Sequence, residues 1–205
     1  MGQKGAETRD RLMDATQELI EAGGYSGAGL NQVVAASGAP RGSLYFHFPH
    51  GKDQLVGESL QRAGREISEA VEGLADSSPS AAEFVEAVLQ HLGDRLEESG
   101  WRKGCPVATV ALEMAATSDP LQEICSEVYT RWEATLAARL GSRADADDLS
   151  VTILALIEGA LLLARSHRSR EPLTCVTRQI TALLAETARR TGGPSFETKI
   201  CRSIY

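Results

Sequence analysis

The sequence predicts an all-helical protein, and three observations support this fold class. Apolar residues recur three and four positions apart through most of the chain, which is the period of a helix that buries one face. No segment shows the strict apolar–polar alternation that is typical of a half-buried β-strand. Glycine, proline and short Ser/Asp stretches interrupt the pattern, as turns between helices require. At 205 residues, the chain is long enough for a small domain followed by a larger one.

The first expected helix spans residues 8–22. Its apolar residues are spaced to form a single face, and they are Leu12, Ala15, Leu19 and Ile20. Gly23 and Gly24 end the pattern, and residues 1–7 are predicted to form a loose arm.

Residues 29–52 predict two short helices that meet at a tight turn. Leu30, Val33 and Val34 place apolar groups on one side of the first of them. Gly38 can take the left-handed conformation that closes this helix without a Cβ clash. Pro40 suits the first turn of the next helix, because its fixed φ is already helical and its missing N–H would have had no partner.

The second of these helices is short and rich in hydrogen-bond donors. Leu44 and Phe48 lie four residues apart and are expected to face inward. Four polar residues are then free to point elsewhere, and they are Arg41, Ser43, Tyr45 and His47. A short helix of this kind, held at an angle by an apolar helix behind it, is the helix-turn-helix arrangement that enters the DNA major groove.

The rest of the chain predicts six more helices. They are expected over residues 52–74, 81–99, 106–117, 119–140, 148–167 and 172–190. The helix over 148–167 is nearly apolar on all sides, so it must be covered by several neighbours. We therefore predict a three-helix DNA-binding domain over 1–52, a larger helical domain over 53–191 and a weakly ordered tail over 192–205.

Composition and charge exclude several classes of protein. The N-terminus lacks the apolar core of a secretory signal, and the apolar run 151–164 is too short to span a bilayer, so we expect a cytoplasmic protein without membrane contact. The net charge is −7, but residues 1–52 hold five basic and five acidic residues, which leaves all of the excess on the remainder. Such an acidic body disfavours nonspecific coating of nucleic acid.

The sequence contains no motif for catalysis or for a cofactor. No nucleophile elbow, phosphate loop or paired catalytic acids occur in a recognisable context, so we expect no enzyme activity and no cofactor. No Cys-x-x-Cys pair occurs, and His47 and His50 have no third ligand nearby, so no metal site is predicted. Cys105 could be a redox sensor or a small apolar core residue.

The segment from Gly38 to Phe48 resembles the recognition segment of TetR-type transcriptional regulators. Its continuation through Lys52 is similar to the LmrA/YxaF-like branch of that family, as is the later run Gly104-Cys105-Pro106-Val107-Ala108. Two features depart from the family pattern. Val34 stands where many relatives carry alanine, and Ala28-Gly29 replaces the usual Thr-Ser helix cap, which weakens capping of that helix.

The resemblance implies a set of DNA contacts. Arg41 would grip a phosphate or a guanine edge, and Lys52 would clamp a phosphate. The full set is Asn31, Gln32, Pro40, Arg41, Gly42, Ser43, Tyr45, His47 and Lys52. A solvated surface role for Arg41 and a packing role for Tyr45 are the alternatives.

The resemblance also implies an apolar pocket for a small effector and a homodimer built from the last two helices. The candidate effector contacts are Trp101, Cys105, Val110, Met114, Tyr129, Trp132, Glu158 and Leu161, all of which could instead be core residues. The candidate dimer contacts are Leu154, Ile157, Leu162, Val176, Ile180 and Leu183. The expected function is repression from a palindromic double-stranded operator. The alternatives are an activator of the same fold, or a helical ligand-binding protein or enzyme without DNA function.

Overall fold

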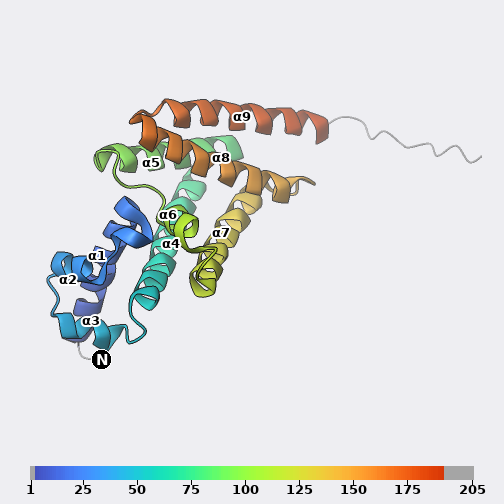
Figure 1. Ribbon diagram of the computed structural model, residues 1–205. Helices are drawn as coiled ribbons and strands as arrows, with labels where there is room; N and C mark the ends of the chain where they lie inside the picture. Colours follow the sequence, from blue (N-terminus) through green and yellow to red (C-terminus); the bar gives the residue numbers. More distant parts are fainter. Residues whose placement is uncertain (1–2, 192–205) are drawn as a thin grey trace, which may run out of the picture.

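The computed structural model describes residues 3–191, with side chains to residue 185, and this part of the chain contains nine helices and no strand. In chain order they are α1 (Gln3–Gly27), α2 (Leu30–Ser37), α3 (Arg41–His47), α4 (Lys52–Ser77), α5 (Ala81–Glu98), α6 (Pro106–Met114), α7 (Asp119–Leu140), α8 (Ala146–His167) and α9 (Glu171–Thr191). The prediction of an all-helical fold is confirmed. The three elements at the N-terminus form a head, and α5 to α9 form a larger body (Figure 1).

The head is built around one apolar cluster. Leu12, Val33, Leu44 and Phe48 are fully enclosed, and they come from α1, from α2, from α3 and from the residue after α3. Leu55, in the first turn of α4, belongs to the same cluster. The domain boundary proposed at residue 52 therefore lies next to a residue that completes the core of the head.

The long helix α4 joins the head to the body (Figure 1). Side chains of α1 hold it along its length: Arg9 pairs with Glu58, and the Arg62 guanidinium lies 2.5 Å from the Asp14 carboxylate. Further along α4, the Trp132 indole N–H of α7 donates to the Gly64 carbonyl at 3.4 Å. The head is thus fastened to the helix that continues into the body.

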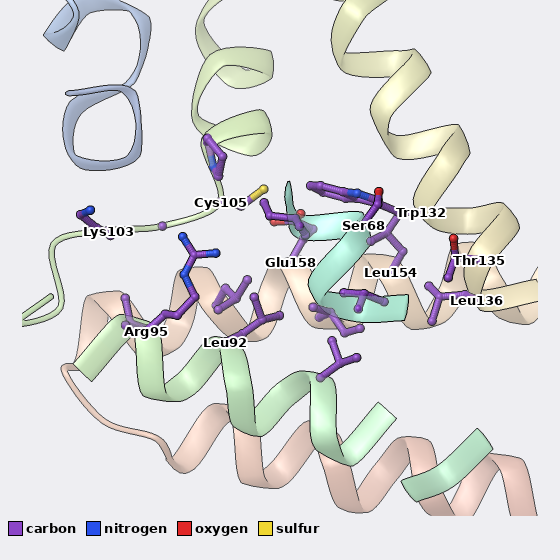
Figure 2. Close-up of a pocket in the computed structure, with 18 of the residues that line it drawn as sticks. Ser68, Leu92, Arg95, Lys103, Cys105, Trp132, Thr135, Leu136, Leu154 and Glu158 are labelled. Atoms are coloured by element: carbon purple, nitrogen blue, oxygen red, sulfur yellow. The ribbon is translucent and has the colours of Figure 1, made fainter. Parts of the chain in front are cut away.

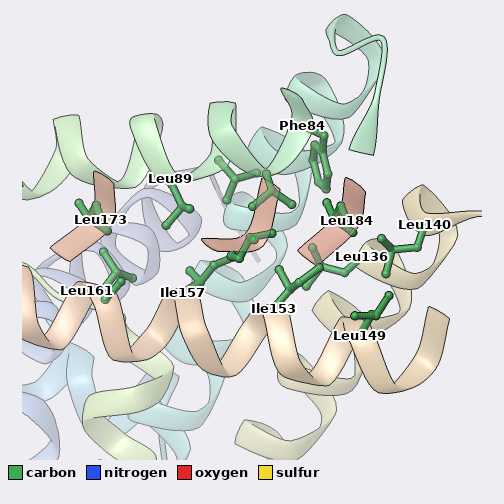
Figure 3. Close-up of a cluster of buried hydrophobic side chains, with 14 of the residues drawn as sticks. Phe84, Leu89, Leu136, Leu140, Leu149, Ile153, Ile157, Leu161, Leu173 and Leu184 are labelled. Carbon is green, nitrogen blue, oxygen red and sulfur yellow. The ribbon is translucent and has the colours of Figure 1, made fainter. Parts of the chain in front are cut away.

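The body is a stack in which α8 lies between α5, α7 and α9. Figure 3 shows the buried side chains between these helices, with Phe84 and Leu89 from α5 facing Ile153 and Ile157 from α8. The apolar run 151–164 is part of a longer helix, α8, which has 22 residues and a mean hydropathy of 1.7 in its most apolar window, so the whole helix has the length and composition of a membrane span. It is instead its packing against three other helices that makes α8 a core helix here.

Several predicted boundaries need correction. The arm expected over 1–7 is helical from Gln3, and the helical backbone of α1 is interrupted only at Gly24, where φ is 66° and ψ is −163°. The helix α6 ends at Met114 rather than at residue 117, because residues 115–117 form a turn before the helix that starts at Asp119. The tail predicted over 192–205 lies outside the described residues.

Candidate DNA-reading helix and effector cavity

The turn between α2 and α3 is set by one glycine and one proline. Gly38 caps α2 in the left-handed conformation with φ 62°, as its position in the sequence predicts. Pro40 is the residue before α3 rather than its first helical residue, with φ −59° and ψ 137°. The chain therefore turns sharply between the two helices and leaves α3 at the end of the molecule opposite α9 (Figure 1).

The outer side of α3 carries three of the nine predicted DNA contacts. Arg41, Gly42 and Tyr45 are exposed, whereas Ser43 is partly buried. On α2, Asn31 is exposed, and the Gln32 side chain accepts a hydrogen bond from the Gly29 backbone N–H at 3.1 Å. Gln32 therefore supplies part of the helix cap that Gly29 cannot provide.

The expectation that the His47 side chain points away from the head is wrong. His47 is only 8% exposed and its Nδ1 has no hydrogen-bond partner among the described residues. The reason is helical geometry: His47 lies one turn after Leu44 and therefore shares its inward side.

Phe46 is the exposed residue that the sequence reasoning missed, since 72% of its surface is accessible. Two positions after Leu44 and two before Phe48, it is turned away from their inward side. This spacing was the signal that could have identified it.

Lys52, at the start of α4, is held by the aromatic ring of Tyr25. The Lys52 ammonium lies 3.9 Å from the ring centroid, and the Tyr25 hydroxyl donates to the Asp53 carboxylate at 2.5 Å. Burial lowers the pKa of Lys52. Burial and the Asp53 hydrogen bond raise the pKa of Tyr25 to about 12. The Lys52 side chain is thus held against Tyr25 at the start of α4.

The body contains an apolar cavity of about 90 Å³ between α4, α5, α7 and α8. Figure 2 shows Leu92, Leu136 and Leu154 around it, with Trp132 at one side. Two cations, Arg95 and Lys103, also contribute to its lining.

A second, more open cavity of about 410 Å³ lies against the first. Four residues line both cavities, and they are Gly104, Cys105, Glu158 and Leu161. The Cys105 thiol and the Glu158 carboxyl lie side by side in this shared wall (Figure 2). Burial, and then the Glu158 carboxyl, raise the pKa of the Cys105 thiol well above its usual range. Burial likewise raises the pKa of Glu158.

Five of the eight predicted effector residues line one cavity or both. They are Cys105, Tyr129, Trp132, Glu158 and Leu161. The other three line neither cavity. Val110 and Met114 belong to the apolar cluster between α1, α4, α6 and α7, one edge of which borders the cavities, and Trp101 packs against the body core. Helical spacing places all three on apolar faces, but only the packing decides which apolar face borders a cavity.

The last turns of α1 are held by residues of the body that surround the cavities. The Gly104 N–H donates to the Glu21 carbonyl at 3.0 Å, and the Arg165 guanidinium donates to the Ala22 carbonyl at 2.7 Å. The Glu21 carboxylate, only 2% exposed, lies 3.2 Å from the Arg95 guanidinium and 3.3 Å from the Lys103 ammonium. Sequence reasoning gave no sign of this junction, because its partners are up to 143 positions apart.

The predicted dimer contacts divide into buried and accessible residues. Ile157 and Ile180 are inside the core of the subunit, so their assignment to a surface between subunits is wrong. Leu154, Val176 and Leu183 are partly buried against the same core. Leu162 is 59% exposed, and Val151 and Leu163 on the same helix are also exposed.

A DNA-reading helix on a compact head, joined to a helical body with an internal cavity, defines a helix-turn-helix transcriptional regulator. Residues 12–58 match the family model for bacterial regulatory proteins of the tetR family, and residues 81–179 match the model for the C-terminal domain of LmrA/YxaF-like transcriptional regulators. The chain belongs to the TetR family, in its LmrA/YxaF-like branch. It is therefore a regulator rather than an enzyme.

Individual relatives agree with this assignment over most of their length. The chain is 33% identical to the HTH-type transcriptional regulator LmrA of Bacillus subtilis over 182 residues, covering 87% of this chain and 97% of LmrA. It is 31% identical to YxaF of the same organism, covering 87% and 95%. A more distant relative, the HTH-type transcriptional repressor DhaR of Mycobacterium sp. GP1, is 24% identical over 80% of this chain and 86% of DhaR. Among solved structures, a TetR transcriptional regulator from Chloroflexus aurantiacus has a TM-score of 0.79 and 26% identity, covering 90% and 98%.

Proposed function

We propose that this regulator is a cytoplasmic homodimeric repressor that leaves a near-palindromic operator when a small apolar molecule occupies the body. The observation that supports this most directly is the separation of two sites. The helix α3 lies at one end of the molecule (Figure 1), and the cavity lies inside the body (Figure 2). The repressor DhaR, although a distant relative, supports the choice of repression over activation.

Arg41 is the proposed centre of the DNA contact. An exposed guanidinium in the first turn of a recognition helix can bind a phosphate or take guanine O6 and N7 together. Gly42 would allow close approach of the backbone, while Tyr45, Ser43 and Lys52 would add phosphate or base-edge contacts. Asn31 and Gln32 would contact the DNA backbone.

Two heads are needed because a single short helix makes few contacts. The exposed apolar side chains of α8, Val151, Leu162 and Leu163, are the part of the body that a second subunit would cover. A two-fold axis at this surface would present two α3 helices to one side of the duplex, which requires an operator with two half-sites.

Two helices would transmit occupancy of the body to the head. Ile67, Ser68 and Val71 of α4 line the cavity, and Leu55 of the same helix completes the core of the head. The end of α1 contacts the cavity wall, where the Gly104 N–H donates a hydrogen bond to the Glu21 carbonyl. A coupling free energy of about 1–3 kcal/mol between the two sites would change operator affinity by about 5–150-fold.

The DNA contact is tested by a gel-shift titration with the DNA upstream of the gene. We expect salt-dependent binding, and we expect Arg41→Ala to weaken it at least tenfold, since each lost guanine or phosphate contact costs about 1–3 kcal/mol and a dimer loses two. Arg131→Ala removes the same charge from an exposed position on α7 and should bind normally. Equal affinities for the two variants would contradict the proposed reading helix.

The regulatory part is tested separately. Sedimentation should show a dimer, and a reporter fused to the same upstream DNA should be more active without the regulator than with it. Lower reporter activity in its absence would indicate an activator instead.

A further inference from the structure

The cations that line the cavities are all engaged by groups of α1. Arg95 and Lys103 pair with Glu21 at 3.2 and 3.3 Å, and Arg165, which lines the second cavity, donates to the Ala22 carbonyl. All three are therefore occupied in holding the end of α1. An anionic ligand would have to compete with Glu21 for two of them.

Glu158 is in the opposite situation. Its carboxyl lies in the wall shared by the two cavities, and no Lys, Arg or His among residues 3–185 lies within 4.0 Å of it. Its polar neighbour is the Cys105 thiol, which is a weak donor (Figure 2). A carboxyl group placed among apolar side chains without a cation is costly to ionise, and a positive charge beside it would offset that cost.

Each of the two cavities that share this carboxyl is also lined by an aromatic ring. Trp132 lines the inner cavity and Tyr129 the outer one, and their rings meet edge to face with centroids 5.7 Å apart. Aromatic faces attract cations within about 6 Å of the ring centroid. The neighbourhood of Glu158 therefore combines two features that favour an organic cation.

We propose that the effector is an apolar amine, with its ammonium group bound by Glu158 between the two cavities and its apolar part along the apolar walls of both. This inference rests on the proposed effector function and adds the chemical class of the ligand. The apolar side chains that line the two adjoining cavities, of about 90 and 410 Å³, take the apolar part, and Glu158, assisted by the rings of Trp132 and Tyr129, selects the charge.

The test uses three ligands that share one alkyl chain and differ in charge: decylamine, decanol and decanoate. Isothermal titration should show that decylamine binds the wild-type protein at least tenfold more tightly than decanol, a difference of about 1.4 kcal/mol, and that decanoate binds most weakly. Equal or tighter binding of decanol or decanoate, or no measurable binding of decylamine, would overturn the proposal.

Two variants separate Glu158 from the general negative charge of the protein. Glu158→Gln should reduce the preference for decylamine over decanol to near unity, and Glu127→Gln, which removes the same charge from an exposed position on α7, should keep it. A preference that survives in Glu158→Gln excludes Glu158 as the binding group. If Glu158→Gln does not fold, the ligand series on the wild-type protein still tests whether the site prefers an amine.

The pH dependence gives a second readout. Ammonium binding favours the ionised carboxylate, so it releases a proton, and decylamine affinity should rise with pH through the acidic range. The other titratable or charged groups around Glu158 are Arg95, Lys103, Cys105, Tyr129 and Arg165. Burial raises the pKa values of Cys105 and Tyr129, so neither of these groups titrates in the acidic range, and the rise should vanish in Glu158→Gln.

Operator binding without any ligand, measured on the same samples, distinguishes the two levels of inference. If the wild-type protein does not bind the operator, the proposed function is contradicted. If the protein binds the operator normally but shows no charge preference among the ligands, only the proposal of an amine effector is contradicted.

Discussion

Two regions of this regulator withdraw carboxyl groups from water, and they do so differently. At the junction between α1 and the body, the Glu21 carboxylate has two cationic partners. In the same region, the Glu113 carboxylate, which remains exposed, accepts hydrogen bonds from the Ser26 N–H at 2.9 Å and from the Ser26 hydroxyl at 2.5 Å. In the wall between the cavities, Glu158 has the Cys105 thiol beside it, and no cation among residues 3–185 lies within 4.0 Å of it. A satisfied carboxylate fixes a structure, whereas one without a cation is suited to bind a charged partner.

Each region therefore has its own role. The junction joins the head to the body through contacts that are already complete, so changes there should appear first as lost stability. In the cavity wall, the Glu158 carboxyl lacks a cationic partner, so changes there should appear in ligand binding and in the reactivity of the neighbouring thiol. The three predictions that follow test this division, beginning with the largest effect.

Two neighbouring glycines give the strongest test of the junction. Gly24 has a φ and ψ that are essentially restricted to glycine, and a Cβ there would overlap the Glu113 carboxylate. We expect Gly24→Ala to lower the free energy of unfolding by about 2–4 kcal/mol. Gly23→Ala meets no atom within 4 Å and should leave stability unchanged or raise it by up to about 1 kcal/mol. Urea denaturation followed by circular dichroism measures the free energy of unfolding of both variants. Similar values for the two would show that the junction tolerates a side chain at Gly24.

A pair of glutamates on α1 tests the charges of the junction. Glu21→Gln leaves Arg95 and Lys103 without their buried partner and should cost about 1–3 kcal/mol, at the lower end of values for buried pairs because both cations are 40% exposed. Glu18, 72% exposed and 4.0 Å from Lys103, should change stability by less than about 0.5 kcal/mol when replaced by glutamine. Urea denaturation measures the free energy of unfolding of both variants. A larger loss for Glu18→Gln than for Glu21→Gln would contradict the role of Glu21 as the main ionic partner at the junction.

The smallest effect concerns the Cys105 thiol. Because burial and the Glu158 carboxyl raise its pKa, little thiolate is present at neutral pH, and alkylation should be slow and become faster as the pH rises. In Glu158→Gln the rate should increase about two- to fivefold, since only the contribution of Glu158 is removed. Burial raises the pKa of Cys125 to about 11 without a contribution from Glu158, so its rate is the internal control. Mass spectrometry of each alkylated peptide gives the rates, and rapid reaction of Cys105 at neutral pH would favour a redox sensor instead.

The elements of the head could be predicted because their signals are local. A glycine at Gly38 and a proline at Pro40 define the turn, and the four-residue spacing of Leu44 and Phe48 gives the inward side of α3. The same spacing, applied to every residue of α3, would also have placed His47 inside and Phe46 outside. That error came from treating polarity as a guide to orientation, although helical geometry is the stronger constraint on so short a helix.

The cavity and the junction could be predicted only in part. Apolar spacing identified the helices that surround the cavity and several of its residues, such as Trp132 and Glu158. It could not exclude Val110 or Met114, which lie on equally apolar faces but pack elsewhere. Nor could it find Arg95 and Lys103, whose position depends on where α1 ends relative to α5.

The sequence by itself determined the helical fold class, the turn that presents α3 and the family to which this regulator belongs. These depend on residues a few positions apart, for which backbone geometry is nearly independent of the rest of the chain. Tertiary structure alone decided which apolar face lines a cavity, which cations hold the end of α1 and that Glu158 is left without one. Those outcomes depend on packing among helices far apart in the chain, and no local spacing encodes it.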